Sequence, residues 1–109
     1  MTTDIPEPAA SLVAAINDHD EERFLAAFAP DGFVDDWGRI FRGREAIDEW
    51  SSRELIGAEG TLSVESVSGS GSGPIVVTGD WRSNHANGPS RFEFAVEGDK
   101  VASMTIREG

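Results

Sequence analysis

The sequence contains no cysteine, which excludes disulfides, thiol nucleophiles and thiolate metal sites. It also has no tyrosine and a single lysine, Lys100, and its formal net charge is −11. The arginines are scattered along the chain and form no cluster. Nucleic acids and anionic membranes both require a basic footprint, so we expect neither as a partner.

Long hydrophobic runs are also missing, and none approaches the roughly 20 residues that span a membrane. Residues 1–8 are acidic, contain two prolines and lack the basic and apolar segments of a signal peptide. We therefore expect a cytoplasmic protein. The 109 residues fit one domain, which we place at 9–109 behind a flexible tail at 1–8.

Helical signals dominate the first half of the chain. Apolar residues recur at helical spacing from Pro8 onward. Asp20 is a good N-cap for a second, short helix, which the turn-forming residues 29–32 should end. A third helix is expected over 44–55, with Trp50 on its buried side.

The remaining segments alternate between apolar and polar residues, as strands do. Short strands are expected at 33–37 and 40–41, and longer ones at 61–68, 75–85, 91–97 and 100–107. Gly98-Asp99 suits a two-residue hairpin turn, and Gly79 in mid-strand should help the sheet to bend. We therefore predict an α+β, cone-shaped fold. Its three N-terminal helices pack on the concave side of a strongly curved, mainly antiparallel sheet of four to six strands.

Three stretches of the sequence are familiar from one group of proteins. They are the paired helical segments at 12–17 and 24–32, the segment 34–38 followed by the G-x-x-A-I pattern in 42–47, and the hairpin at 98–101. The chain resembles the nuclear transport factor 2-like superfamily, in its SnoaL-like (polyketide cyclase-like) branch, over about residues 9–107. The resemblance implies an apolar pocket between helices and sheet. It implies no single reaction, because this fold hosts enzymes, binders and assembly modules.

The expected pocket is apolar and should take a small, largely apolar molecule. Aromatic side chains are expected to line it: Phe28, Phe33, Trp37, Trp50, Trp81, Phe92 and Phe94. No metal or cofactor is expected, because neither histidine, His19 or His85, has a carboxylate at a diagnostic spacing. Related curved sheets often pair through their outer faces, so the resemblance also implies a homodimer.

Asp36 is the first candidate for chemistry. Ketosteroid isomerase-like relatives have a general base at the matching position, and a carboxylate in an apolar pocket suits that role. If Val34 faces the helices, Asp36 reaches the cavity, and its hydrogen-bond partner should be Trp50 or His85. His85, on the predicted face of Trp81, is the candidate auxiliary acid. The alternatives are a polar strand end for Asp36 and a turn histidine for His85.

Other features of the sequence argue against a steroid-type isomerase. Such relatives use a tyrosine and a protonated aspartate as an oxyanion hole, and the matching positions here hold Leu12 and Arg91. Asp80 and Arg82 resemble a pair found in limonene epoxide hydrolase-like members, but their strand face is polar and predicts a cross-strand surface pair. Three interpretations stay open. They are proton transfer of the isomerase, cyclase or dehydratase type, a non-catalytic ligand-binding or dimerisation module, and a pocket filled by side chains.

Overall fold

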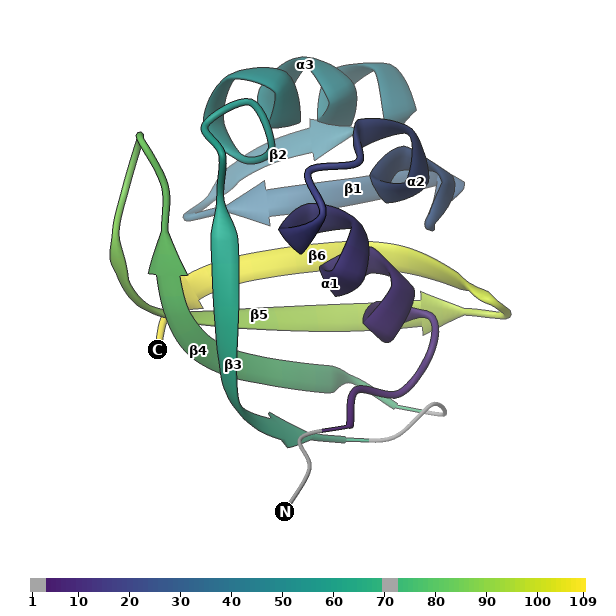
Figure 1. Cartoon of the computed structure of the whole chain (residues 1–109). Coiled ribbons are helices and arrows are strands. Elements are labelled where there is room, and N and C mark those ends of the chain that lie inside the picture. Colours follow the sequence, from purple (N-terminus) through teal and green to yellow (C-terminus); the bar gives the residue numbers. More distant parts are fainter. Residues whose placement is uncertain (1–3, 70–72) are drawn as a thin grey trace.

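The computed structural model describes residues 4–69 and 73–109 (Figure 1). The elements are α1 (Ala9–Asn17), α2 (Glu21–Ala26), β1 (Phe28–Asp36), β2 (Arg39–Arg42), α3 (Arg44–Glu54), β3 (Thr61–Ser68), β4 (Ile75–Arg82), β5 (Gly88–Glu97) and β6 (Lys100–Glu108). Three helices thus precede a β-rich second half. The predicted α+β class is confirmed.

The strands form one sheet in the order β2-β1-β6-β5-β4-β3. β1 and β6 are parallel, and every other neighbouring pair is antiparallel. Figure 1 shows the sheet curving around α1, with the helices on its inner side. The cone-shaped fold with a mainly antiparallel sheet is therefore present as predicted. Gly98 takes the expected positive φ, 63°, in the hairpin between β5 and β6.

β3 is irregular where it pairs with Gly79 of β4. The pairing register shifts between Val64 and Ser66, which marks a bulge in β3 beside this glycine. A Cβ atom added to Gly79 would overlap with the carbonyl oxygen of Ser63. Only glycine therefore lets the bulged strand approach this closely, in line with the bending role expected from the sequence.

One hydrophobic core fills the space between the helices and the inner face of the sheet. The alternation along β4 and β5 places Val77, Phe92 and Phe94 in this core, and Trp50 enters it from α3. Trp50 and Trp81 are both buried. Buried side chains thus fill the space between the helices and the inner face of the sheet.

Several boundaries differ from the sequence-based expectation, among them the start of β5, which lies at Gly88 and not at residue 91. Residues 29–32, expected as a turn, belong to β1, whose register with β6 shifts between Phe28 and Phe33. β4 ends at Arg82, so His85 lies in the β4–β5 loop and not on a strand. There the Ser83 hydroxyl accepts hydrogen bonds from the backbone N–H groups of His85 and Ala86, which closes a tight turn.

The expected tail and the glycine-rich loop are only partly described. Of the tail, Ile5 packs against the core, and the Glu7 carboxylate accepts two hydrogen bonds from Ser11. These contacts connect residues 5–8 to α1. Residues 1–3 and 70–72 lie outside the described residues.

Candidate functional site

The end of β1 sends neighbouring side chains to opposite faces of the sheet. Val34 is buried on the inner face, and Asp36 follows it there. Asp35 lies on the outer face, where both of its oxygens accept hydrogen bonds from Arg107, each 3.1 Å long. The Arg107 guanidinium, helped by the backbone N–H of Gly38, holds the pKa of Asp35 below its usual value. Asp35 is therefore an ion-paired anchor between β1 and β6.

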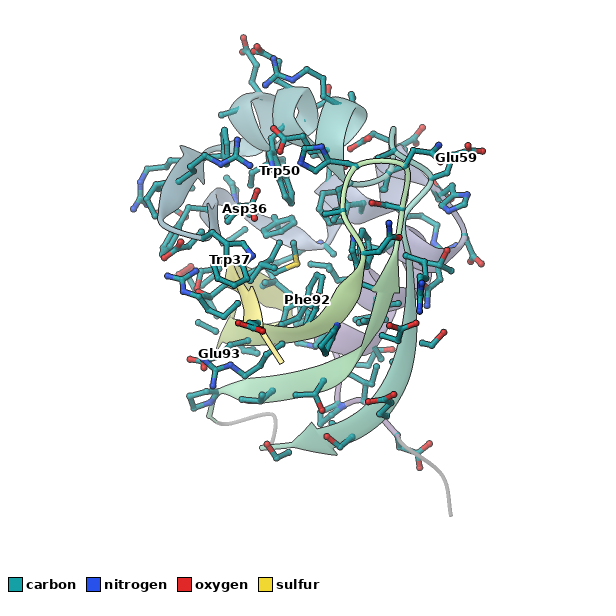
Figure 2. The ribbon with its side chains drawn as sticks, turned by 90° about the vertical axis from the view of Figure 1, so that its left-hand side faces the viewer. Asp36, Trp37, Trp50, Glu59, Phe92 and Glu93 are labelled. Carbon is teal, nitrogen blue, oxygen red and sulfur yellow. The ribbon has the colours of Figure 1, made fainter. Side chains whose placement is uncertain are left out.

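Asp36 points toward the space below Trp50 (Figure 2), and its side chain is 14% exposed. Its Oδ2 atom accepts a hydrogen bond from Trp50 Nε1 at 3.1 Å, so the donor is Trp50, one of the two partners expected from the sequence. The same oxygen is paired with Arg39. Within the described part of the chain, Oδ1 has no hydrogen-bond partner. Asp36 is thus held at one oxygen and free at the other.

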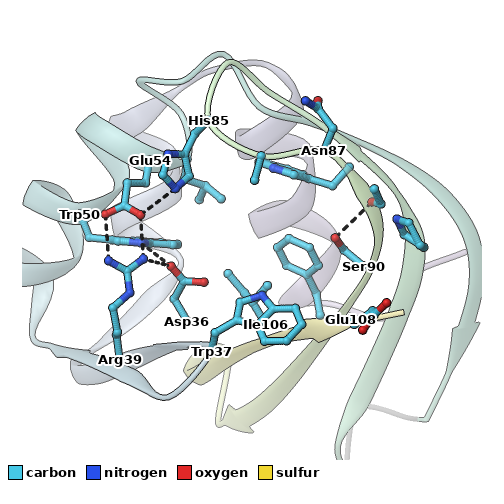
Figure 3. A pocket seen from close by; sticks show the side chains of 16 residues that line it. Asp36, Trp37, Arg39, Trp50, Glu54, His85, Asn87, Ser90, Ile106 and Glu108 are labelled. Atoms are coloured by element: carbon cyan, nitrogen blue, oxygen red, sulfur yellow. Dashed lines mark hydrogen bonds and ion pairs between the residues drawn. The ribbon is translucent and has the colours of Figure 1, made fainter.

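A second carboxylate, Glu54 at the end of α3, completes this network (Figure 3). Arg39 donates to it through Nη2 at 2.7 Å and Nη1 at 3.2 Å. His85 Nε2 lies 3.1 Å from Glu54 Oε1. The Arg39 guanidinium, more than the charge of His85, lowers the pKa of Glu54. His85 therefore contacts Glu54 and, among the described residues, makes no hydrogen bond to Asp36.

A pocket of about 370 Å³ opens beside this network, between the end of α3, the β1–β2 turn and the β4–β5 loop. Small-molecule sites commonly have a volume in this range. Six residues singled out from the sequence line it: Asp36, Trp37, Trp50, Trp81, His85 and Phe92. The pocket thus combines aromatic walls with a charged end.

The structure places the other three expected lining residues elsewhere. Phe28 and Phe94 are fully buried in the core, deeper in the cone than the pocket. Phe33 lies on the outer face, because it is out of phase with Val34, and the Arg42 guanidinium lies 4.7 Å from its ring centroid. Packing, not ligand contact, accounts for these three rings.

Sequence reasoning missed three charged lining residues: Arg39, Glu54 and Glu108. The position of Arg39 could have been predicted from the sequence, because a two-residue turn at Trp37-Gly38 makes Asp36 and Arg39 opposite partners in the hairpin. No local sequence pattern predicts Glu54 at the pocket, since α3 meets β2 only in the tertiary structure. Asp36 consequently sits beside a guanidinium and not in the purely apolar pocket that its position suggested.

Two further expectations concern Asp80 with Arg82, and metals. Arg82 Nε donates to Asp80 Oδ2 at 2.8 Å, so the pair lies on the surface as expected but within one strand and not across strands. Over residues 4–69 and 73–109, no group of three or more histidine or acidic side chains is placed to hold a metal ion. In the same described ranges, no helix has the length and apolarity needed to cross a membrane.

Comparison with known proteins identifies the fold. No protein-family model matches the sequence, and no curated protein matches it. Among solved structures, a proposed polyketide cyclase from Sinorhizobium meliloti aligns with a TM-score of 0.78 and 18% identity, covering 91% of this chain and 92% of that one. An NTF2-like protein of unknown function from Cytophaga hutchinsonii aligns at 0.79 and 12%, covering 98% and 93%.

A third similar structure holds a ligand. It is a Mycobacterium tuberculosis protein in complex with estradiol-17beta-hemisuccinate, with a TM-score of 0.77 and 20% identity, covering 93% of this chain and 90% of that one. The likenesses confirm the predicted fold: the chain has the NTF2-like fold.

Proposed function

We propose that this protein binds a small, largely apolar molecule in the pocket at the mouth of its cone. The observation that carries the proposal is the cavity of about 370 Å³, walled by Trp50, Trp81 and Phe92 and open beside Asp36. A structurally similar protein holds a steroid ester, which supports a ligand of this kind. Asp36, Arg39 and Glu54 gather at one end of the pocket and Glu108 lies across it (Figure 3), so charged groups at both sides would orient the ligand.

Proton transfer with Asp36 as base is the second candidate, favoured by the free Oδ1 atom. A substrate C–H or O–H placed against this oxygen could lose its proton there, with His85 as the auxiliary acid at the pocket rim. Stabilising the resulting oxyanion is the weak point, because Trp50 Nε1 already donates to Asp36. Asp36→Asn should then abolish turnover of any substrate while ligand binding persists. Unchanged turnover would exclude this role.

Ligand binding is testable with the protein's own fluorescence, because all three tryptophans line the pocket. We expect titration with estradiol, or with another small apolar molecule of similar size, to give saturable quenching and a higher melting temperature. Ser90→Phe should fill the pocket and abolish both effects, because Ser90 is a lining residue. Ser63→Phe, on exposed β3, is the matched control. No saturation with any of a set of such molecules, or equal binding by Ser90→Phe, would contradict the proposal.

We also propose that two copies pair through the outer face of the sheet. Val76 and Thr78 are half-buried on this face, while Asp80 and Arg82 add a charged pair beside them. A face of this mixed character predicts a modest interface that weakens with salt. Light scattering at rising protein concentration should show the dimer, and a monomer at every concentration would refute it.

A further inference from the structure

We propose that the molecule bound in this pocket carries a positively charged amine, seated at Trp37 between the carboxylates of Asp36 and Glu108. This inference rests on the proposed function and names the chemical class of the ligand. The proposal rests on the cavity and its aromatic wall, and the charges at the rim of the cavity indicate the chemical class of the ligand.

The balance of charge at the pocket disfavours an anionic ligand. Its described lining holds three carboxylates, from Asp36, Glu54 and Glu108, against one guanidinium, from Arg39. The imidazole of His85 also lines the pocket, but it already contacts Glu54. Both terminal nitrogens of Arg39 already donate to carboxylates, two bonds to Glu54 and one to Asp36. An anionic group would therefore meet like charges and no free guanidinium, whereas a cation would restore the balance.

The conformation and exposure of Trp37 are the second observation that supports a cationic ligand. The backbone of Trp37 has φ 54°, a conformation that bulky residues rarely adopt, and the residue is 61% exposed. Strand alternation would place Trp37 on the outer face with Asp35. The left-handed turn redirects it, and the indole lines the pocket instead. The left-handed backbone at Trp37 costs conformational free energy, and an exposed indole does not offset this by packing in the core. A strained residue of this kind points to a role in binding.

The neighbours of Trp37 give the third observation. Figure 3 shows Trp37 along one wall of the pocket, with Asp36 on one side and Glu108 on the other. Asp36 offers its free Oδ1, and Glu108 has no ion pair within residues 4–69 and 73–109. An aromatic face beside carboxylates is a common arrangement for recognising alkylammonium groups. The apolar body of the ligand would extend toward Trp81 and Phe92.

The test is a matched series of ligands that share one apolar skeleton: 4-phenylbutylamine, 4-phenylbutyltrimethylammonium, 4-phenylbutan-1-ol and 4-phenylbutanoate. Affinities are measured by tryptophan fluorescence and calorimetry. We expect both cations to bind about tenfold tighter than the alcohol, and the carboxylate to bind weakest. Asp36→Asn and Glu108→Gln should each reduce the affinity for the amine several-fold and leave the affinity for the alcohol unchanged. Trp37→Ala should affect the trimethylammonium ligand most.

Because the whole protein is strongly acidic, attraction of any cation needs its own control. Glu97→Gln removes one exposed carboxylate outside the pocket lining and should leave the preference for amines intact. The Glu108 side chain makes no hydrogen bond or ion pair within the described residues, so its variant remains informative if Asp36→Asn fails to fold. Equal affinity for amine and alcohol would overturn this inference and leave the proposed function standing. An equal loss in Glu97→Gln would also overturn it, and binding of none of these ligands or of any steroid would remove the proposed function itself.

Discussion

Replacing Trp50 with alanine is expected to lower the free energy of unfolding by about 3–5 kcal/mol. Its side chain is 1% exposed, and it stacks on Phe41 with ring centroids 5.7 Å apart. Alanine would leave a large cavity under α3 and remove the donor that holds Asp36. A loss of this size is a large fraction of the stability of a small domain. Chemical denaturation followed by circular dichroism measures it.

Trp37→Ala is the control for this experiment, because Trp37 is equally large but mostly exposed. It should change the unfolding free energy by no more than about 0.5 kcal/mol. Trp81→Ala should resemble Trp50→Ala, since Trp81 is buried and packs 5.7 Å from the ring centroid of Phe92. Equal melting of Trp50→Ala and Trp37→Ala would show that α3 is not held by its tryptophan.

Replacing Gly79 with alanine should cost stability at the upper end of the about 1–3 kcal/mol usual for overpacking. The new methyl group would collide with the backbone of β3 at Ser63, and backbone cannot rotate away as a side chain can. β3 would have to move off the sheet edge. Thermal unfolding, with amide exchange in β3 as a local readout, would show the effect.

Gly73→Ala is the matched control for Gly79→Ala. No described atom lies within 4 Å of a Cβ at this position, and its backbone is not left-handed. Alanine there should therefore be neutral or slightly stabilising, because it restricts the unfolded chain. Similar losses for both variants would mean that the close approach of β3 at Gly79 does not matter for the fold.

Alternation and turn signals predicted the fold because they report local geometry. Phe92, Phe94 and Val77 identify the inner face of the sheet, and Gly98 identifies its last hairpin. The same signals misplaced the start of β1 at Phe28. A bulged strand has the composition of a turn at 29–32, and the hydrogen bonds that make it a strand come from β6, far along the chain.

The site was predictable only where it follows from the strand pattern. Alternation with Val34 turned Asp36 inward, and helix periodicity brought Trp50 to the same space. The bridge from Arg39 to Glu54 depends on how α3 packs over β2, which no local pattern encodes. The conformation of Trp37 is also invisible in the sequence, since tryptophan is an unusual choice for a left-handed turn.

The place of β6 in the sheet has a consequence for biosynthesis. β6 is the last strand along the chain, yet it lies between β1 and β5. Asp35 and Arg107, which join β1 to β6, are 72 residues apart. The β1–β2 hairpin therefore has no sheet to join until residues 100–108 have left the ribosome. The unpaired edge of this hairpin is exposed to other chains during that interval. Strand pairings between residues far apart in the sequence also favour slow folding.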